Sequence, residues 1–205
     1  MQMFFSCFFV AFSQTLFAET KFDHVKAAHD RESKAKTESL CTDNERVVFT
    51  CTIKQKVASV CASNDFSNIS GYMQYRFGEI GSPEILIPKK HKLSQSDIAF
   101  NFNTTGHGGY ASYIRFSQRS YKYYIYDASA VTGPDPKTGL RSLEEHSGVY
   151  VTKNQNVVFS QECNSPAFDN ELFYDVGGES FWGNAIPKLN EDDINPFDIA
   201  FPYKP

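Results

Sequence analysis

The chain lacks the features by which nucleic-acid-binding and membrane proteins are usually recognised. Its 205 residues carry a net charge of −4 at pH 7, and its lysines and arginines form no basic stripe. A protein that follows a phosphate backbone needs such a stripe, so we expect no nucleic-acid partner. After residue 18 no stretch approaches the ~18 consecutive apolar residues that span a bilayer. We therefore expect no insertion into a membrane.

Signatures of catalysis and of cofactor binding are also missing. The sequence has no G-x-S-x-G elbow and no H-E-x-x-H pair, and its five histidines are scattered without the spacing of metal ligands. The cysteines form no C-x-x-C pair with a nearby histidine, which argues against zinc. We therefore expect a non-catalytic protein with no metal and no cofactor. Paired carboxylates stay open as catalytic groups, because their separation depends on the tertiary structure.

The first eighteen residues form a long apolar segment without a charged side chain. The segment ends at Ala18, and Glu19 begins a polar region. This length and this ending predict a cleaved signal peptide at residues 1–18, although the usual positive residues near its start are absent. The alternative is a buried apolar first helix, which the polar residues 19–39 would not continue. We expect the protein to be periplasmic or secreted.

Removal of the signal peptide would take Cys7 away and leave four cysteines. An even count in an exported chain predicts two disulfides. Two sets of alternating residues place a cysteine on an apolar strand face: Val47, Phe49, Cys51 and Ile53, and Val157, Phe159 and Cys163. This alternation favours a Cys51–Cys163 disulfide, with Cys41–Cys61 as the remaining pair. The rival scheme joins Cys51 to Cys61 within a hairpin and Cys41 to Cys163, and the sequence does not decide between the two.

From residue 46 onward, short runs rich in Val, Ile, Tyr and Phe alternate with turn residues. Such runs are typical of β-strands. The predicted strands are 46–54, 57–63, 71–78, 83–88, 97–103, 109–117, 121–130, 148–153 and 156–163. Nine short strands at close spacing predict an all-β fold, an antiparallel meander of about eight or nine strands that forms a barrel or a sandwich.

The segments around these strands differ in composition. Residues 19–40 are rich in charge and predict a polar helix or linker before a disulfide-containing β domain at 41–163. Residues 164–205 are rich in aromatic residues and proline, so we expect this extension to pack on the β domain with one short strand at 171–176. The connection at 131–147 is much longer than a hairpin needs, and long loops of this kind are disproportionately functional.

Two features inside the predicted strands call for partners. Within residues 121–126 tyrosines alternate onto both faces, with Tyr124 and Tyr126 opposite Ile125. Aromatic side chains on both faces predict cover from the C-terminal extension, a wide interior or an exposed adhesive surface. Arg76 is expected on the face opposite the core. There we predict that it pairs with a carboxylate or stacks on a tyrosine.

The segment 104–110, Thr-Thr-Gly-His-Gly-Gly-Tyr, is the most unusual local feature of the chain. Its three glycines let the backbone adopt positive φ and approach a partner closely. One interpretation is an ordinary hairpin loop in which the glycines only satisfy turn geometry. The other is an exposed recognition loop. The candidate binding residues are Thr105, His107, Tyr110, Tyr113, Arg115 and Tyr124, since tyrosine and arginine often anchor interfaces.

Three short motifs carry a resemblance to known proteins. The segments V-F-T-C at 48–51, V-A-S-V-C-A-S at 57–63 and Y-R-F-G at 75–78 resemble a group of uncharacterised bacterial exported proteins, over residues 41–163 at most. More distantly, the combination of an F-x-C strand with a final cysteine-bearing strand is similar to the bacterial periplasmic lysozyme inhibitors. That resemblance implies a small β-barrel whose protruding loop blocks a lysozyme cleft. The family's S-A-S-G-A-R-Y segment is absent here, and residues 105–110 replace it only loosely.

These observations lead to one preferred function and two alternatives. We expect a non-catalytic exported binding protein that occludes a protein partner, such as a cell-wall hydrolase or a toxin, as an inhibitor or immunity protein does. The first alternative is a glycan- or ligand-binding β module, which the abundance of tyrosine and the single Trp182 suggest. The second is a hydrolase that uses a pair of carboxylates.

Overall fold

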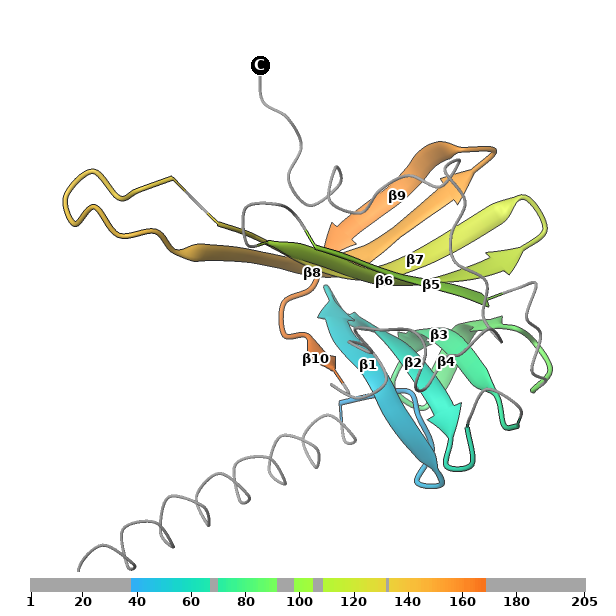
Figure 1. The fold of residues 1–205 in the computed structure, drawn as a ribbon. Helices are drawn as coiled ribbons and strands as arrows, with labels where there is room; N and C mark the ends of the chain where they lie inside the picture. Colours follow the sequence, from blue (N-terminus) through green and yellow to red (C-terminus); the bar gives the residue numbers. More distant parts are fainter. Residues whose placement is uncertain (1–37, 67–69, 92–97, 105–108, 132, 169–205) are drawn as a thin grey trace, which may run out of the picture. The chain divides into compact units, whose positions relative to one another are not determined.

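The computed structural model describes residues 38–66, 70–91, 98–104, 109–131 and 133–168, and its described regular structure consists of β-strands (Figure 1). Several predicted segments lie outside the described residues: the signal peptide at 1–18, the linker up to residue 37, and the extension from 169, including the strand expected at 171–176. The strands all belong to a compact unit that begins at Glu38.

The described residues contain ten strands: β1 (Glu45–Ile53), β2 (Lys56–Ser63), β3 (Met73–Glu79), β4 (Ser82–Ile87), β5 (Ile98–Thr104), β6 (Tyr110–Gln118), β7 (Tyr121–Val131), β8 (Leu143–Lys153), β9 (Asn156–Glu162) and β10 (Ala167–Phe168). All nine predicted strands are present. The prediction succeeds because each run combines β-branched or aromatic residues with a turn at both ends.

The strands form two antiparallel five-stranded sheets. The first has the order β10-β1-β2-β3-β4 and the second the order β5-β6-β7-β8-β9. One hydrophobic core joins side chains from both, with Val48 and Val60 from the first sheet and Phe116 and Ile125 from the second, all fully buried. Tyr75 of β3 contacts the Phe116 ring across the sheets, with 6.0 Å between ring centroids. The all-β prediction is confirmed, and of its two forms the structure shows the sandwich.

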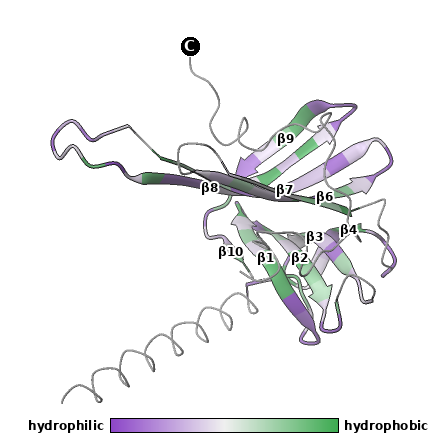
Figure 2. Cartoon of the chain, in the orientation of Figure 1, coloured by the Kyte–Doolittle hydropathy of each residue, from purple (hydrophilic) through white to green (hydrophobic). Residues whose placement is uncertain are grey.

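Hydrophobic residues concentrate where the sheets face each other, as the green bands along β1 in Figure 2 illustrate. Two irregularities change the predicted alternation. A bulge between Val47 and Phe49 brings Val48 into the core and leaves Val47 half-buried, so the expected apolar face of β1 is wrong at Val47. A second bulge pairs Val157 with Thr152 and Phe159 with Val151. Val157 and Phe159 therefore lie on opposite faces, not on the one face predicted.

Both disulfides follow the preferred scheme. One joins Cys41 to Cys61, and the other joins Cys51 to Cys163, 112 residues further along the chain. The long-range disulfide links β1 of the first sheet to the residue after β9 of the second. The chain crosses here from the second sheet to the first, and the backbone N–H of Asn164 donates to the carbonyl of Thr52 at the crossing.

The expectation of a loop over the whole of 131–147 is wrong. β7 reaches Val131, and β8 begins at Leu143, so that strand pairing replaces loop over residues 143–147. Register explains the difference, because Leu143 to Ser147 pair one by one with Val131 to Asp127. Glu144 and Glu145 within this stretch have little intrinsic preference for strands, which is why the sequence did not predict it.

Candidate functional site

Three of the predicted binding residues lie together on one face of the second sheet. Arg115 of β6 pairs with Tyr124 of β7, which in turn pairs with Tyr150 of β8. Tyr113 follows Arg115 on the same face, and its ring lies 6.4 Å from that of Tyr124. This face points away from the core, because Ile125 and the other residues between them belong to the core. We call it the tyrosine face and define it by Tyr113, Tyr124, Tyr126 and Tyr150.

The rings of the tyrosine face pack closely. Tyr124 and Tyr150 stack with centroids 4.4 Å apart and planes 7° from parallel, and Tyr126 leans on Tyr150 at 5.8 Å. A Cβ on Gly148 would meet Tyr126 atoms at 2.9 Å and the Gln161 carbonyl oxygen at 2.5 Å, so Tyr126 occupies the space that only glycine leaves. Burial, with a smaller effect of nearby carboxylates, raises the pKa of Tyr126 to about 12. This shift further favours the neutral phenol, which packs against the Tyr150 ring.

Tyr110 lies on the other face, apart from the tyrosine face. Its hydroxyl donates to the carboxylate of Asp127 at 2.6 Å, and the Ser147 hydroxyl donates to the second oxygen of that carboxylate at 2.5 Å. The predicted loop residues Thr105 and His107 lie outside the described residues. The six predicted binding residues are thus not one surface in the described structure. The sequence could have predicted this separation, because Tyr110 and Tyr113 are three positions apart on β6 and residues an odd number of positions apart point to opposite faces of a strand.

Beyond the tyrosine face, β7 and β8 lead into an extension that we call the arm (residues 130–144). Its strands end at the pair Val131–Leu143, and the described residues between these two form no strand. β6 reaches along β7 only as far as Ser129, and β9 reaches along β8 only as far as Gly148. Past these points β7 and β8 pair only with each other among the described strands. Figure 1 shows the arm running out from the sheet. Described residues from 133 to 145 are all exposed.

The tip of the arm is a tightly hydrogen-bonded turn. The Asp135 carboxylate accepts hydrogen bonds from the backbone N–H groups of Lys137 and Thr138, at 2.8 and 2.7 Å, and from the Thr138 hydroxyl. The backbone of Asp135 pairs with Leu140 and Gly139, and Gly139 adopts a φ of +68°. These hydrogen bonds lower the pKa of the Asp135 carboxyl, because they favour its charged form. These are the contacts by which an aspartate stabilises a turn, here at an exposed position.

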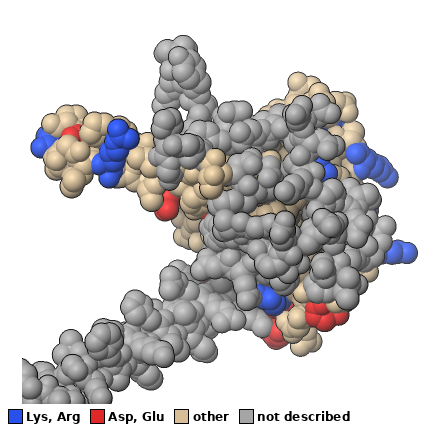
Figure 3. Space-filling model, viewed as in Figure 1, with Lys and Arg blue, Asp and Glu red and all other residues tan. Residues whose placement is uncertain are grey.

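The side chains that the tip presents are apolar and basic. Leu140 in this turn is 71% exposed, and Leu143, the first residue of β8, is 57% exposed. Lys137 and Arg141 are close to them in the sequence and are exposed, and Figure 3 shows basic groups on the arm. A leucine flanked by cations is suited to an apolar pocket with an acidic rim.

At the base of the arm an imidazole bridges two carboxylates. His146 Nδ1 lies 2.6 Å from Glu162 of β9, and its Nε2 lies 3.1 Å from Glu144. Partial burial lowers the pKa of His146, but the hydrogen bonds and charges of both glutamates outweigh it, so the pKa is raised overall. Both glutamates are more than half exposed. They lack the enclosed setting that glycosidase carboxylates use, so this pair offers no support for the hydrolase alternative.

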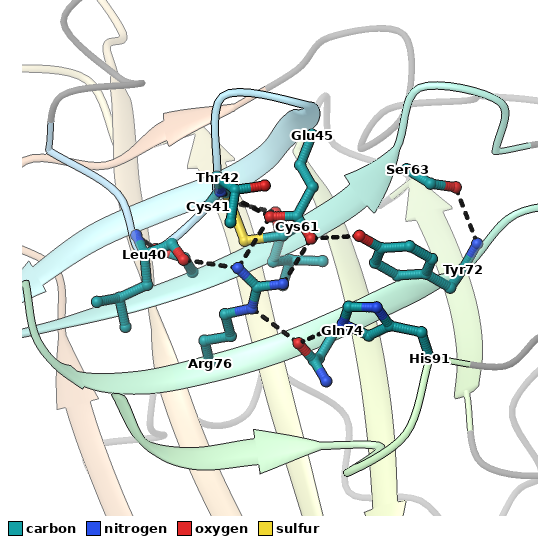
Figure 4. A network of polar contacts seen from close by, with 12 residues as sticks. Leu40, Cys41, Thr42, Glu45, Cys61, Ser63, Tyr72, Gln74, Arg76 and His91 are labelled. Carbon is teal, nitrogen blue, oxygen red and sulfur yellow. Dashed lines mark hydrogen bonds and ion pairs between the residues drawn. A yellow bond between two sulfur atoms is a disulfide. The ribbon is translucent and has the colours of Figure 1, made fainter. Parts of the chain in front are cut away.

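A buried ion pair lies on the first sheet, in the network of Figure 4. Arg76 of β3 forms an ion pair with Glu45 at the start of β1, at 2.5 and 2.9 Å, and both side chains are at most 7% exposed. Arg76 also donates to the carbonyl of Leu40 and to Gln74. The prediction that Arg76 pairs with a carboxylate is confirmed. The partner, 31 residues earlier, was not identified from the sequence because nothing local distinguishes Glu45 from the other glutamates.

Every acceptor position of the Glu45 carboxylate has a donor. One oxygen accepts from Arg76 and from the Tyr72 hydroxyl, and the other accepts from Arg76 and from the backbone N–H of Thr42. His91 stacks on the Tyr72 ring at 3.8 Å. Burial raises the pKa of Glu45, but these donors more than offset it and hold it at about 2. A carboxylate held this way is not a general acid or base at neutral pH, so the network locks the segment before β1 onto the sheet.

Comparison with known proteins adds no family to this description. No family model, no curated protein sequence and no solved structure matches the chain. Within the described residues, no group of three or more potential metal ligands is present, and no helix is long and apolar enough to cross a membrane.

Proposed function

We propose that the chain is an exported, non-catalytic binding protein that occludes a protein partner, a cell-envelope hydrolase or a toxin, by inserting the arm. The observation that carries this proposal is the tip of the arm, where Asp135 holds the turn and Leu140 is exposed. An insertion element needs a preformed conformation, because ordering a flexible loop on binding weakens affinity. It also needs an exposed anchor residue, and Leu140 has that exposure.

Export is supported by two features of different origin. The two disulfides suit an oxidising compartment, and the apolar residues 1–18 predict a signal peptide. These two features support our proposal that the protein is periplasmic or secreted. The segment 104–110, for which the sequence leaves open both an ordinary hairpin loop and a recognition loop, stays a second candidate; its residues 105–108 lie outside the described residues.

The alternative of a glycan-binding module needs an aromatic platform that a sugar can reach. The described tyrosines of the tyrosine face are at most 4% exposed, so they do not offer such a platform. Protein binding through the arm is better supported, because the large exposed apolar residues of the described chain include two on the arm, Leu140 in its tip and Leu143 at the start of β8.

The proposal is tested with purified mature protein and a panel of purified cell-wall hydrolases: a lysozyme, a lytic transglycosylase and an amidase. We expect a stable complex with at least one enzyme and inhibition of its activity. Leu140→Asp should weaken that complex by about 30-fold or more, as expected when an anchor worth about 2 kcal/mol is removed. Asp135→Ala should weaken it less, through loss of the ordered turn.

Ile80→Asp is the matched control. Ile80 is 56% exposed, is also a large aliphatic residue, and occupies the turn between β3 and β4, away from the arm. It should bind as the unchanged protein does. The proposal is to be abandoned if no enzyme of the panel forms a complex, or if Leu140→Asp and Ile80→Asp bind equally well.

A further inference from the structure

The tyrosine face is buried, although it is an outer face of the sandwich. Tyr113, Tyr124, Tyr126 and Tyr150 are between 0% and 4% exposed. The first sheet packs on the opposite face of the second sheet, where Ile114, Phe116 and Ile125 enter the core. Among the described residues no strand lies over the tyrosines (Figure 1). Their burial therefore requires a cover that the described strands do not supply.

The chemistry of the face defines what can cover it. Three successive rungs run across β6, β7 and β8 on this side: Ala111, Ala128 and His146; Tyr113, Tyr126 and Gly148; Arg115, Tyr124 and Tyr150. The two alanines are buried together with the four tyrosines in one apolar cluster. Arg115 adds a positive charge at one margin. An aromatic segment with acidic residues would complement both properties.

We propose that residues 169–205 of the same chain cover the tyrosine face. This segment follows β10 directly and contains seven aromatic residues: Phe173, Tyr174, Phe181, Trp182, Phe197, Phe201 and Tyr203. It also carries eight acidic residues and two lysines, whereas residues 1–168 carry sixteen acidic and eighteen basic residues. The segment thus has the apolar bulk and the sign of charge that the face requires.

The segment also starts close enough to reach the face. It leaves from Phe168, which pairs with Phe49 of β1 at the edge of the first sheet, with 5.2 Å between the rings. The layers of a sandwich lie about 10 Å apart, and an extended chain advances about 3.3 Å per residue, so a few residues suffice to pass both sheets. A covalently tethered segment has an effective concentration in the millimolar range. Cover from the same chain is therefore favoured over cover from a second copy.

Trp182 provides the test, because it is the only tryptophan of the chain and lies in this segment. We expect its fluorescence in the native full-length protein to be blue-shifted and poorly quenched by acrylamide, compared with the protein in concentrated guanidinium chloride. Ala128→Arg places a long charged side chain in the middle of the face. It should shift the emission to the red and raise quenching toward the denatured value, while both disulfides form and the urea midpoint shows a folded domain.

Ile80→Arg is the control, since Ile80 is exposed on the first sheet, and it should leave Trp182 unchanged. If Ala128→Arg does not fold, Ala111→Arg tests the same face one strand away. The proposal is overturned if acrylamide quenches Trp182 as readily in the native protein as in guanidinium chloride. This measurement needs no variant. Protection that disappears on dilution, together with a dimer in light scattering, would show that a second copy provides the cover and would also overturn it.

Discussion

Replacing Glu45 by glutamine should remove a pH-dependent part of the stability of the domain. The carboxyl has a pKa of about 2 in the folded protein, against 4.5 for an unperturbed glutamate. Each pKa unit corresponds to about 1.4 kcal/mol, so the charged form of Glu45 stabilises the folded state by roughly 3 kcal/mol. Solvent screening does not reduce this figure much, because Glu45 is only 3% exposed.

The sign of the effect follows from the direction of the shift. A carboxyl whose pKa is lower in the folded state contributes stability above its unfolded pKa, and that stability is lost as the pH falls through the folded pKa. The contribution of Glu45 should therefore be complete at pH 7 and decline from about pH 5 to about pH 2. Glu45→Gln keeps the shape of the side chain but leaves the Arg76 guanidinium buried without its counter-charge, which typically destabilises by about 3–5 kcal/mol.

Urea denaturation with both disulfides intact, followed by tyrosine fluorescence or circular dichroism at a series of pH values, measures the effect. We expect the free energy of unfolding of Glu45→Gln to lie at least about 3 kcal/mol below that of the unchanged protein at pH 7. The two should approach each other toward pH 2. Glu84→Gln is the control, because Glu84 pairs with Lys56 at the surface, is 49% exposed and should matter by less than about 1 kcal/mol. A difference that stays constant from pH 7 to pH 2 would refute this account.

Two further predictions concern the disulfides and the base of the arm. Removal of the Cys51–Cys163 disulfide by paired alanine substitutions should lower the free energy of unfolding by about 5 kcal/mol, against about 3 kcal/mol for the Cys41–Cys61 disulfide, because Cys51–Cys163 closes the longer loop. Urea titration of both variants measures these two losses. The reverse order would contradict the explanation by loop entropy. In an NMR titration, His146 should keep its proton to higher pH than an unperturbed histidine. Glu162→Gln should lower the pKa of His146. An unchanged titration midpoint in that variant would show that the Glu162 carboxylate does not act on His146.

Local patterns in the sequence were sufficient for the strands. Alternating apolar residues such as Ile98 and Phe100, bounded by turn residues, have the two-residue period of a strand that is buried on one face. The period belongs to the chain itself and does not depend on distant contacts. The choice between barrel and sandwich did depend on them, because it concerns which strands remain at the edges of a sheet.

The functional features were harder to predict because contacts between distant residues create them. The alternation of Tyr124 and Ile125 indicated a second aromatic face, but its partners Tyr113 and Tyr150 come together only through the register of three strands. The length and the proline and glycine residues of 131–147 predict a loop, yet residues 143–147 belong to β8 although most of them have low strand propensity. Pairing with β7 overrides that propensity, as cross-strand contacts commonly do.

The sequence by itself determined the strand-rich class, the expectation of export and the favoured disulfide pairs, since these depend on composition, period and cysteine count. Only the tertiary structure decided that Glu45 is the partner of Arg76, that β7 and β8 extend into an arm, and that Tyr110 lies apart from Tyr113. The physical reason is common to all three. Register and layer packing bring residues together across tens of positions, and no local pattern encodes which of many similar side chains will meet.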